Sequence, residues 1–168
     1  REAIRKLELE GLVVMLPRKG AYVANISVKD LMDVLEIRAS LEGLGASLAA
    51  ERRTEEDIKN LEEIEEEFEQ AVITQDIDML LKKDIEFHEC IFKAANNKKL
   101  EKMINSLWEQ VQRFRITYVS DSNASLSLID EHRIILNAIK EGNVADGKKA
   151  AIEHIEKAEQ FMLEHCTK

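Results

Sequence analysis

Proline and glycine are scarce in this sequence, which holds one proline and six glycines among 168 residues. Both residues interrupt regular helices and mark tight turns. Their scarcity, together with a charged fraction of 34%, therefore favours an almost wholly helical protein. An apolar fraction of 45% is enough for a real core and argues against global disorder. The length suits one substantial domain, or one domain with a fragment of another.

Long apolar runs and paired cysteines are missing as well. No stretch approaches the roughly 20 apolar residues that span a bilayer, so we expect no membrane partner. No secretory signal is visible, and the sequence starts at Arg1 without a methionine, as a fragment would. Cys90 and Cys166 lie 76 residues apart and outside any Cys-x-x-Cys pair, which indicates two reduced, packing cysteines in a cytoplasmic protein.

The net charge of −9 is unevenly distributed. Residues 1–25 hold five basic and three acidic residues, a balance of +2, so the rest of the chain carries −11. A small basic piece can bind nucleic acid, whereas an acidic body cannot lie flat on it. The asymmetry predicts two modules with different partners, residues 1–25 and residues 26–168.

The N-terminal module has the pattern helix, strand, basic turn, strand. Residues 1–10 have helical periodicity and end at Gly11, a residue suited to a helix C-terminus. Two short β-type runs, 12–16 and 21–24, flank a turn at 17–20 that holds an arginine and a lysine. This order is typical of the second half of a winged helix-turn-helix, in which cations contact DNA phosphates. A surface hairpin with a basic tip is the alternative.

From Ser27 onward the pattern predicts six helices with short connections, hence an antiparallel bundle. Capping residues mark the first three helix starts: Ser27 and Thr54, each with an aspartate three residues later, and Asp76. Residues 121–123 form the one polar loop of note, and we interpret the acidic run 62–67 as the solvated face of the second helix. The expected helices span about residues 27–52, 54–72, 76–97, 98–118, 125–140 and 143–165. The predicted fold class is mainly α, with a six-helix antiparallel bundle preceded by the C-terminal part of a winged helix-turn-helix.

Four residues of the bundle form a candidate metal site. Asp84 and His88 lie four residues apart, so their side chains stack on one face of the third helix. His132 and His154 lie mid-helix among apolar neighbours, on helices that must pack against the third. Each residue alone also fits an ordinary packed or hydrogen-bonded side chain, but three imidazoles and one carboxylate together suit Zn²⁺, Ni²⁺ or a related ion in a bundle core. His165 is excluded because it falls in the fraying tail.

Three arginines of the bundle, Arg38, Arg113 and Arg115, are candidate partners for an anionic effector. Guanidinium groups bind carboxylates bidentately, and an open position on the metal would also receive a carboxylate, such as a dicarboxylate or a hydroxy acid. The alternative for each arginine is a salt bridge within this very acidic body.

Two N-terminal stretches resemble the end of the DNA-binding domain of GntR-family transcription regulators: REAIRKLELEGLV at residues 1–13 and PRKGAYV at 17–23. The resemblance covers about the last third of that domain. It implies that the helix presents arginines to DNA and that the glycine lets the wing tip approach the DNA backbone. The positions expected to contact DNA are Arg1, Arg5, Arg18, Lys19 and Gly20.

Four motifs mark the helical body: Glu36-x-Arg38-x-x-Leu41-Glu42, Asp84-x-x-Phe87-His88, Glu131-His132-Arg133 and Ala150-Ala151-x-x-His154-Ile155. Over residues 28–163 the body resembles the FCD ligand-binding domain of the FadR subfamily, and its six helices fit the smaller, VanR-like group. The spacing of the four candidate ligands fits the metal-binding members. The resemblance implies a pocket for small organic acids, often anchored on a metal, in a homodimer that binds operator DNA. Residues 143–147 depart from the family pattern, at a helix cap and not at a metal position.

We therefore predict a DNA-binding transcription regulator whose helical domain binds a divalent metal and a small organic-acid effector that modulates operator binding. A metal-dependent hydrolase is one alternative, because an ion with an open position can activate water. Against it, no general base with a clear motif stands near the ligands, and a basic winged helix has no use in a hydrolase. A helical dimerisation module with a purely structural metal is the other alternative. We expect that the protein is not an enzyme.

Overall fold

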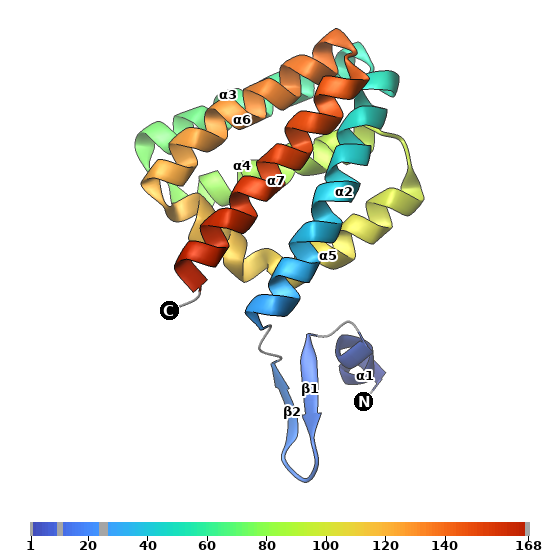
Figure 1. The fold of residues 1–168 in the computed structure, drawn as a ribbon, viewed down its shortest axis with the longest axis vertical. Coiled ribbons are helices and arrows are strands. Elements are labelled where there is room, and N and C mark those ends of the chain that lie inside the picture. Colours follow the sequence, from blue (N-terminus) through green and yellow to red (C-terminus); the bar gives the residue numbers. More distant parts are fainter. Residues whose placement is uncertain (1, 10–11, 24–26, 167–168) are drawn as a thin grey trace.

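The structure is a computed structural model that describes residues 2–9, 12–23 and 27–166, apart from the side chains of Arg113 and Cys166. Six helices form a bundle, and a short helix with a two-stranded hairpin projects from one end of it (Figure 1). This arrangement confirms the predicted fold class. The bundle helices are α2 (Val28–Arg52), α3 (Glu55–Thr74), α4 (Ile77–Ala94), α5 (Lys98–Ser120), α6 (Ser122–Glu141) and α7 (Val144–Cys166). None of the helices within the described residues is long and apolar enough to cross a membrane.

The first three bundle helices begin where their capping residues predict. The Ser27 hydroxyl accepts a hydrogen bond from the backbone N–H of Asp30, and the Asp30 carboxylate accepts one from the backbone of Ser27. Thr54 and Asp57 form the same reciprocal pair at the start of α3, and Asp76 caps α4. Each cap satisfies backbone N–H groups that have no partner inside the helix, which fixes the helix start.

The predicted polar loop at residues 121–123 is wrong, because Asp121 alone separates α5 from α6. Its side chain accepts hydrogen bonds from the backbone N–H groups of Asn123 and Ala124, at 3.0 and 2.9 Å. Those contacts make Asp121 the N-cap of α6, so Ser122 and Asn123 already belong to the first helical turn.

α2 and α7 share the most extensive helix contact in the bundle and run side by side in Figure 1. Glycine permits this close approach: a Cβ atom at Gly43 would lie 2.7 Å from Cγ1 of Ile152 on α7. At Gly45 a Cβ atom would lie 2.8 Å from the ring of Phe92 on α4. α2 is therefore held tightly against two of the helices that carry the candidate ligands.

The apolar core is divided into two main clusters, one toward each end of the bundle. One contains Leu31, Phe68, Leu80, Leu128 and Met162, among others. The other contains Ala46, Leu61, Phe87, Ile135 and Ala150, among others. Five helices, α2, α3, α4, α6 and α7, contribute residues to both clusters. Between the two clusters lie buried polar residues. We call these residues the polar layer: Arg38, Glu42, Glu65, Asp84, His88, Arg115, Glu131, His132 and His154.

The N-terminal part consists of α1 (Glu2–Leu9) and two antiparallel strands, β1 (Val13–Leu16) and β2 (Gly20–Val23). α1 packs against β1, and the hairpin lies beyond the start of α2 (Figure 1). The turn is tight, with Leu16 opposite Gly20, and Gly20 adopts a φ of 102° that favours glycine. The order of helix, strand, basic turn and strand agrees with the predicted pattern.

Candidate metal and effector site

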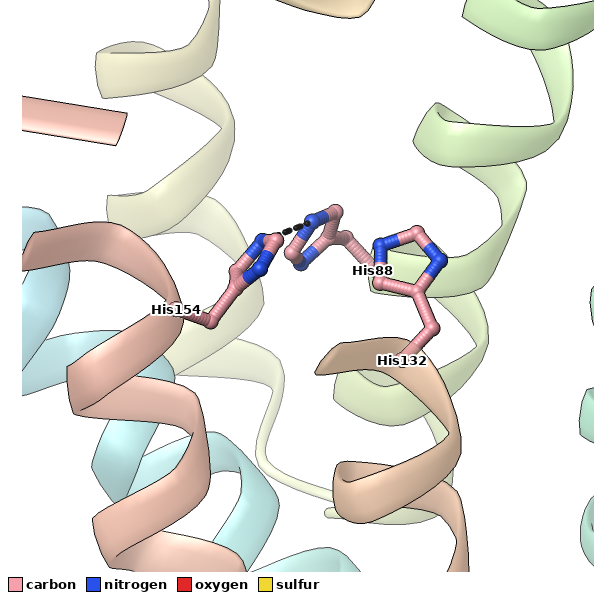
Figure 2. A group of neighbouring side chains, drawn as sticks. All are labelled: His88, His132 and His154. Carbon is pink, nitrogen blue, oxygen red and sulfur yellow. Dashed lines mark hydrogen bonds between the residues drawn. The ribbon is translucent and has the colours of Figure 1, made fainter. Parts of the chain in front are cut away.

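Three histidines from three helices meet in the polar layer. His88 comes from α4, His132 from α6 and His154 from α7, and all three are buried (Figure 2). One ring nitrogen of each can be chosen such that the three atoms lie within 4.8 Å of one another. The structure thus brings three of the four predicted ligands into one cluster, and we call these three residues the histidine cluster.

Two rings of the histidine cluster face each other through Nε2 atoms. The Nε2 atoms of His88 and His154 lie 3.3 Å apart. Each ring has a glutamate on its other side: His88 Nδ1 lies 3.2 Å from Glu42 Oε2, and His154 Nδ1 lies 2.9 Å from Glu131 Oε2. A carboxylate selects the tautomer with a proton on Nδ1, so both neutral rings then turn a lone pair toward the same point. A cation at that point would remove the repulsion between the lone pairs.

His132 also has a glutamate beside its Nδ1, but no hydrogen bond joins the two groups. Its Nδ1 lies 3.3 Å from Glu65 Oε2 and its Nε2 lies 3.6 Å from Asp84 Oδ1, but neither contact has hydrogen-bond geometry. The ring is fully buried and stacks on Phe87 with a centroid distance of 4.1 Å. A fully buried imidazole that uses neither nitrogen among the described residues is unusual, because buried polar atoms are nearly always paired. Its chemistry fits a metal ligand with a carboxylate behind it.

Asp84, the fourth predicted ligand, lies beside the histidine cluster and is shared with an arginine. Its Oδ2 lies 3.1 Å from Nε of Arg115, while its Oδ1 faces His132. Burial by itself would raise the pKa of Asp84, but Arg115 and the three neighbouring histidines together outweigh burial and lower it. The carboxylate is therefore ionised and retains one oxygen that points toward the histidine cluster.

The electrostatics of the layer keep Glu42 and Glu131 ionised and one imidazole neutral. Burial lowers the pKa of His88 to about 4, against the opposing effect of the Glu42 carboxylate. Burial would raise the pKa of Glu131, but its contacts with His154, Ser127 and Lys157 together outweigh burial and bring the pKa to about 2. A neutral imidazole is the form that binds metal ions, and a carboxylate behind it strengthens the ligand.

A small cavity of about 30 Å³ adjoins the histidine cluster, and Asp84, His88 and His154 line it. That volume holds one water-sized species. Two of the predicted effector arginines, Arg38 and Arg115, also line the cavity. The side chain of the third, Arg113, lies outside the described part of the chain.

Both lining arginines also form the salt bridges that the alternative interpretation predicts. Arg38 Nη2 donates to Glu42 Oε1 at 3.0 Å, and Arg115 pairs with Asp84. The Nε–H of Arg38 nevertheless finds no acceptor among the described residues, although it is buried. Arg38 therefore keeps a donor for a ligand even while it holds Glu42.

Three functional candidates were missed: Glu42, Glu65 and Glu131, the carboxylates behind the three imidazoles. The interpretation of residues 62–67 as a wholly solvated face is wrong for Glu65, whose exposed fraction is only 4%. The spacing of Leu61, Glu65 and Phe68 placed this glutamate on the buried stripe of α3, because residues four and three apart share a helix face. That signal was present in the sequence but was hidden by the acidic neighbours of Glu65.

The predicted DNA-contacting positions lie at the N-terminal end of the molecule. Arg5 is exposed on α1, and Arg18, Lys19 and Gly20 form the exposed tip of the hairpin. Arg1 and the predicted boundary between the two modules, at residues 25–26, lie outside the described residues. The basic tip is thus accessible to a polyanion.

A helical bundle with a buried polar layer, preceded by a short two-stranded hairpin, has the architecture of FCD-like helical domains. Residues 33–157 match the FCD domain family. The chain belongs to the GntR family of transcription regulators, in the FadR subfamily, and consists mostly of the FCD domain.

Similar proteins support this assignment. The chain is 29% identical to the uncharacterized HTH-type transcriptional regulator YdhC of Bacillus subtilis, over 92% of this chain and 68% of that protein. It is also 29% identical to the HTH-type transcriptional regulator LutR of the same organism, over 96% of this chain and 82% of that protein. The solved structure of E. coli McbR/YncC shares the fold, with a TM-score of 0.88 at 21% identity over 98% of this chain and 83% of the other. The two Bacillus subtilis relatives are transcriptional regulators, which confirms the prediction of a regulator and not an enzyme.

Proposed function

We propose that this regulator binds a divalent metal ion at the histidine cluster and a small organic acid beside it, and that the acid modulates binding of operator DNA. One observation carries the proposal. Two imidazole Nε2 atoms lie 3.3 Å apart, the third ring is close by, and the Nδ1 of every ring faces a buried glutamate. Carboxylate–histidine pairs arranged around one point are typical of metal sites.

The residues that would hold the ion are the three histidines and Asp84. Three nitrogens and one oxygen suit Zn²⁺ or Ni²⁺ among the first-row ions. Once bound, such an ion supplies positive charge and open positions that attract a carboxylate. The three glutamates would fix the ring orientations and keep Nε2 directed at the ion, while Arg115 would orient Asp84.

α2 is the element that would connect the effector site to the DNA-binding part. It begins at Val28, close to the winged helix, and it carries both Arg38 and Glu42 into the polar layer. From Val28 to Arg38 the helix rises about 15 Å. A ligand that accepts a hydrogen bond from the spare Nε–H of Arg38 would pull on α2, and with it on the N-terminal part.

A homodimer fits this function, because two linked winged helices can read two half-sites of an operator. The exposed face of α2 supports the proposal, since Ile37 and Leu44 lie seven residues apart on one side of the helix and remain 51% and 42% exposed. Apolar residues on one helix face are typical of an interface between protein chains. DNA would bind at the basic hairpin tip and along α1.

Elemental analysis of the purified protein tests the metal site. We expect one equivalent of a transition metal in the wild-type protein and a loss of tightly bound metal in His132→Ala and in His154→Ala. His165→Ala is the matched control, because His165 lies on α7 like His154 but is exposed at the surface. Equal metal content in all four proteins would show that the histidine cluster does not hold the ion.

A further inference from the structure

The cavity beside the histidine cluster has two chemically different ends. Its polar end consists of Arg38, Asp84, His88, Arg115 and His154. The remainder of its wall is apolar apart from the Tyr118 side chain, and includes Leu31, Leu35, Val111, Phe114, Ile155 and Met162. A ligand that fills such a cavity needs one polar group at one end and hydrocarbon at the other. Hydroxyl groups directed at the apolar wall would lose their hydrogen bonds to water without gaining new ones.

Arg38 supplies a specific partner at the polar end. Its Nε–H has no acceptor among the described residues, and its side chain is only 6% exposed. A buried donor without a partner carries a desolvation cost, which a ligand oxygen at this position would relieve. The ligand group at the polar end is therefore a hydrogen-bond acceptor, and the neighbouring guanidinium of Arg115 favours an anionic one.

The formal charges of the polar layer leave room for one anion. Four carboxylates and two guanidinium groups give the layer a formal charge of −2. A divalent ion would neutralise it, and the Lys157 ammonium, 3.1 Å from Glu131 Oε1 at the rim, adds one positive charge. The remaining positive charge would balance one carboxylate on the ligand. A second carboxylate would lie against the apolar wall without a counter-charge.

We propose that the effector is a short monocarboxylate with an apolar body: the carboxylate binds the Arg38 end of the cavity, and the hydrocarbon packs on the wall formed by Leu31, Leu35 and Val111. The inference rests on the proposed function for its effector role. It narrows the small organic acids expected from the sequence, and it disfavours dicarboxylates and sugar acids. The cavity as it stands holds one water-sized species, so every such acid requires the wall to move outward, and the shortest bodies require the least movement.

Calorimetric titration with acetate, propionate and butyrate tests the proposal on the protein as purified, with its metal content measured in parallel. Each added methylene group that enters the apolar wall should strengthen binding about fourfold. Succinate, which has the length of butyrate but a second carboxylate, should bind at least about tenfold more weakly than butyrate. Gluconate should not bind. Tighter binding of succinate or gluconate than of butyrate would overturn the inference, as would the absence of any binding.

Two substitutions test the apolar wall and the polar end of the cavity separately. Val111→Thr keeps the shape of the side chain but adds a hydroxyl to the wall, so it should weaken butyrate several-fold and leave acetate unchanged. Val144→Thr, at an exposed position on α7, is its control. Arg38→Lys keeps the positive charge but removes the spare Nε–H, so it should weaken all three acids about equally. If Val111→Thr weakens acetate as much as butyrate, the apolar body does not lie on this wall.

Failure of this inference can be told apart from failure of the proposed function. If the purified protein contains no metal while the three acids still show the fourfold series, the metal proposal fails and the cavity assignment stands. If metal is present but succinate binds best, the metal proposal stands and the monocarboxylate assignment fails.

Discussion

At the scale of single residues, Glu65 and His132 form the pair that most strongly indicates a bound cation. Both are buried and lie 3.3 Å apart, yet neither carboxylate oxygen of Glu65 has a hydrogen-bond partner among the described residues. A buried carboxylate without a partner costs about 1–3 kcal/mol or more, so a structure keeps one only where something else compensates for it. A metal ion on the opposite nitrogen of His132 would strengthen this contact by polarising the imidazole.

Glu65→Gln tests that pair without a change of size. We expect the metal affinity to fall about 10- to 100-fold, because the imidazole loses its carboxylate partner. The metal-free protein should be as stable as the wild type or more stable, since an unpaired buried charge is removed. Glu66→Gln, the exposed neighbour on α3, should change neither quantity. Competition with a chelator of known affinity measures the effect, and an unchanged affinity in Glu65→Gln would contradict the role of this glutamate.

Trp108 should report on the site directly, because it is the single tryptophan of the sequence. Its indole Nε1–H donates to Glu42 Oε1 at 3.1 Å, and Glu42 Oε2 contacts His88. Metal binding to His88 would tighten the imidazole–Glu42 contact and change the environment of the indole. We therefore expect addition of Zn²⁺ to the metal-stripped protein to change the Trp108 fluorescence, with a stoichiometry of one. The response should vanish in His154→Ala, and a response that persists there would place the metal elsewhere.

The sequence indicated the candidate ligands more readily than their partners. Asp84 and His88 share a face by helical spacing alone, and two further histidines lie among apolar neighbours on helices expected to pack against α4. Glu42 could not be recognised as a partner of His88, because the contact joins residues 46 positions apart and depends on how α2 packs on α4. Likewise, the sequence left open whether Arg38 binds an effector or a glutamate. In the structure its Nη2 donates to Glu42, while its Nε–H has no acceptor among the described residues.

At the scale of helices, the contact between α2 and α7 depends on Gly43. Alanine is a better helix former than glycine by about 1 kcal/mol, so Gly43→Ala would stabilise an isolated helix. The added Cβ would lie 2.7 Å from Ile152, however, and overpacking of this kind costs about 1–3 kcal/mol. We expect the steric effect to win and Gly43→Ala to lower the free energy of unfolding by about 1 kcal/mol. Ser40→Ala, exposed on the same helix, should be neutral or slightly stabilising in the same denaturant titration.

The hairpin should act as a wing that contacts phosphates. In a protein with a complete DNA-binding domain, the double substitution Arg18→Ala and Lys19→Ala should weaken binding to all DNA sequences. It should also make the slope of log binding constant against log salt concentration shallower, by the equivalent of up to about two phosphate contacts. Removal of two exposed cations on the bundle, Lys59→Ala and Lys149→Ala, is the control. A salt slope that is unchanged in the hairpin variant would exclude phosphate contacts by the wing.

Helix positions followed from the sequence wherever a cap was unambiguous. Ser27, Thr54 and Asp76 each precede a clear apolar pattern, and the three helices begin beside them. Asp121 was misinterpreted because an aspartate followed by a serine and an asparagine has the composition of a loop. Only the hydrogen bonds of its side chain to the next turn identify it as an N-cap, and these depend on the path that the chain takes between α5 and α6.

At the scale of the whole molecule, a metal held by three helices should stabilise the bundle. Free metal at 100 times its dissociation constant would add about 2.7 kcal/mol to the free energy of unfolding. For a chain of this length that corresponds to a rise of about 5–10 °C in Tm. Removal of metal with a chelator should reverse the rise in the wild type and in His165→Ala. In His132→Ala the chelator should have no effect, and an equal shift there would contradict the assigned ligands.

Regulation by an effector requires that the effector site and the DNA-binding part influence each other, and α2 is the element that would connect them. An effector that changes operator affinity must itself bind differently when operator is present, because the coupling is reciprocal, and values of about 1–3 kcal/mol are typical. The coupling should depend on the metal, since Asp84 and the histidines form part of the same polar layer as Arg38 and Glu42.

The most direct test is a titration of operator DNA, selected from a random-sequence library, against the protein with its complete DNA-binding domain. Operator affinity would be measured with and without saturating butyrate or another acid of the calorimetric series, in the metal-loaded and in the metal-stripped protein. We predict that the acid changes operator affinity about 5- to 150-fold in the metal-loaded protein and far less in the stripped one. An acid that binds the metal-loaded protein but leaves operator affinity unchanged would contradict the account. So would an equal change with and without the metal.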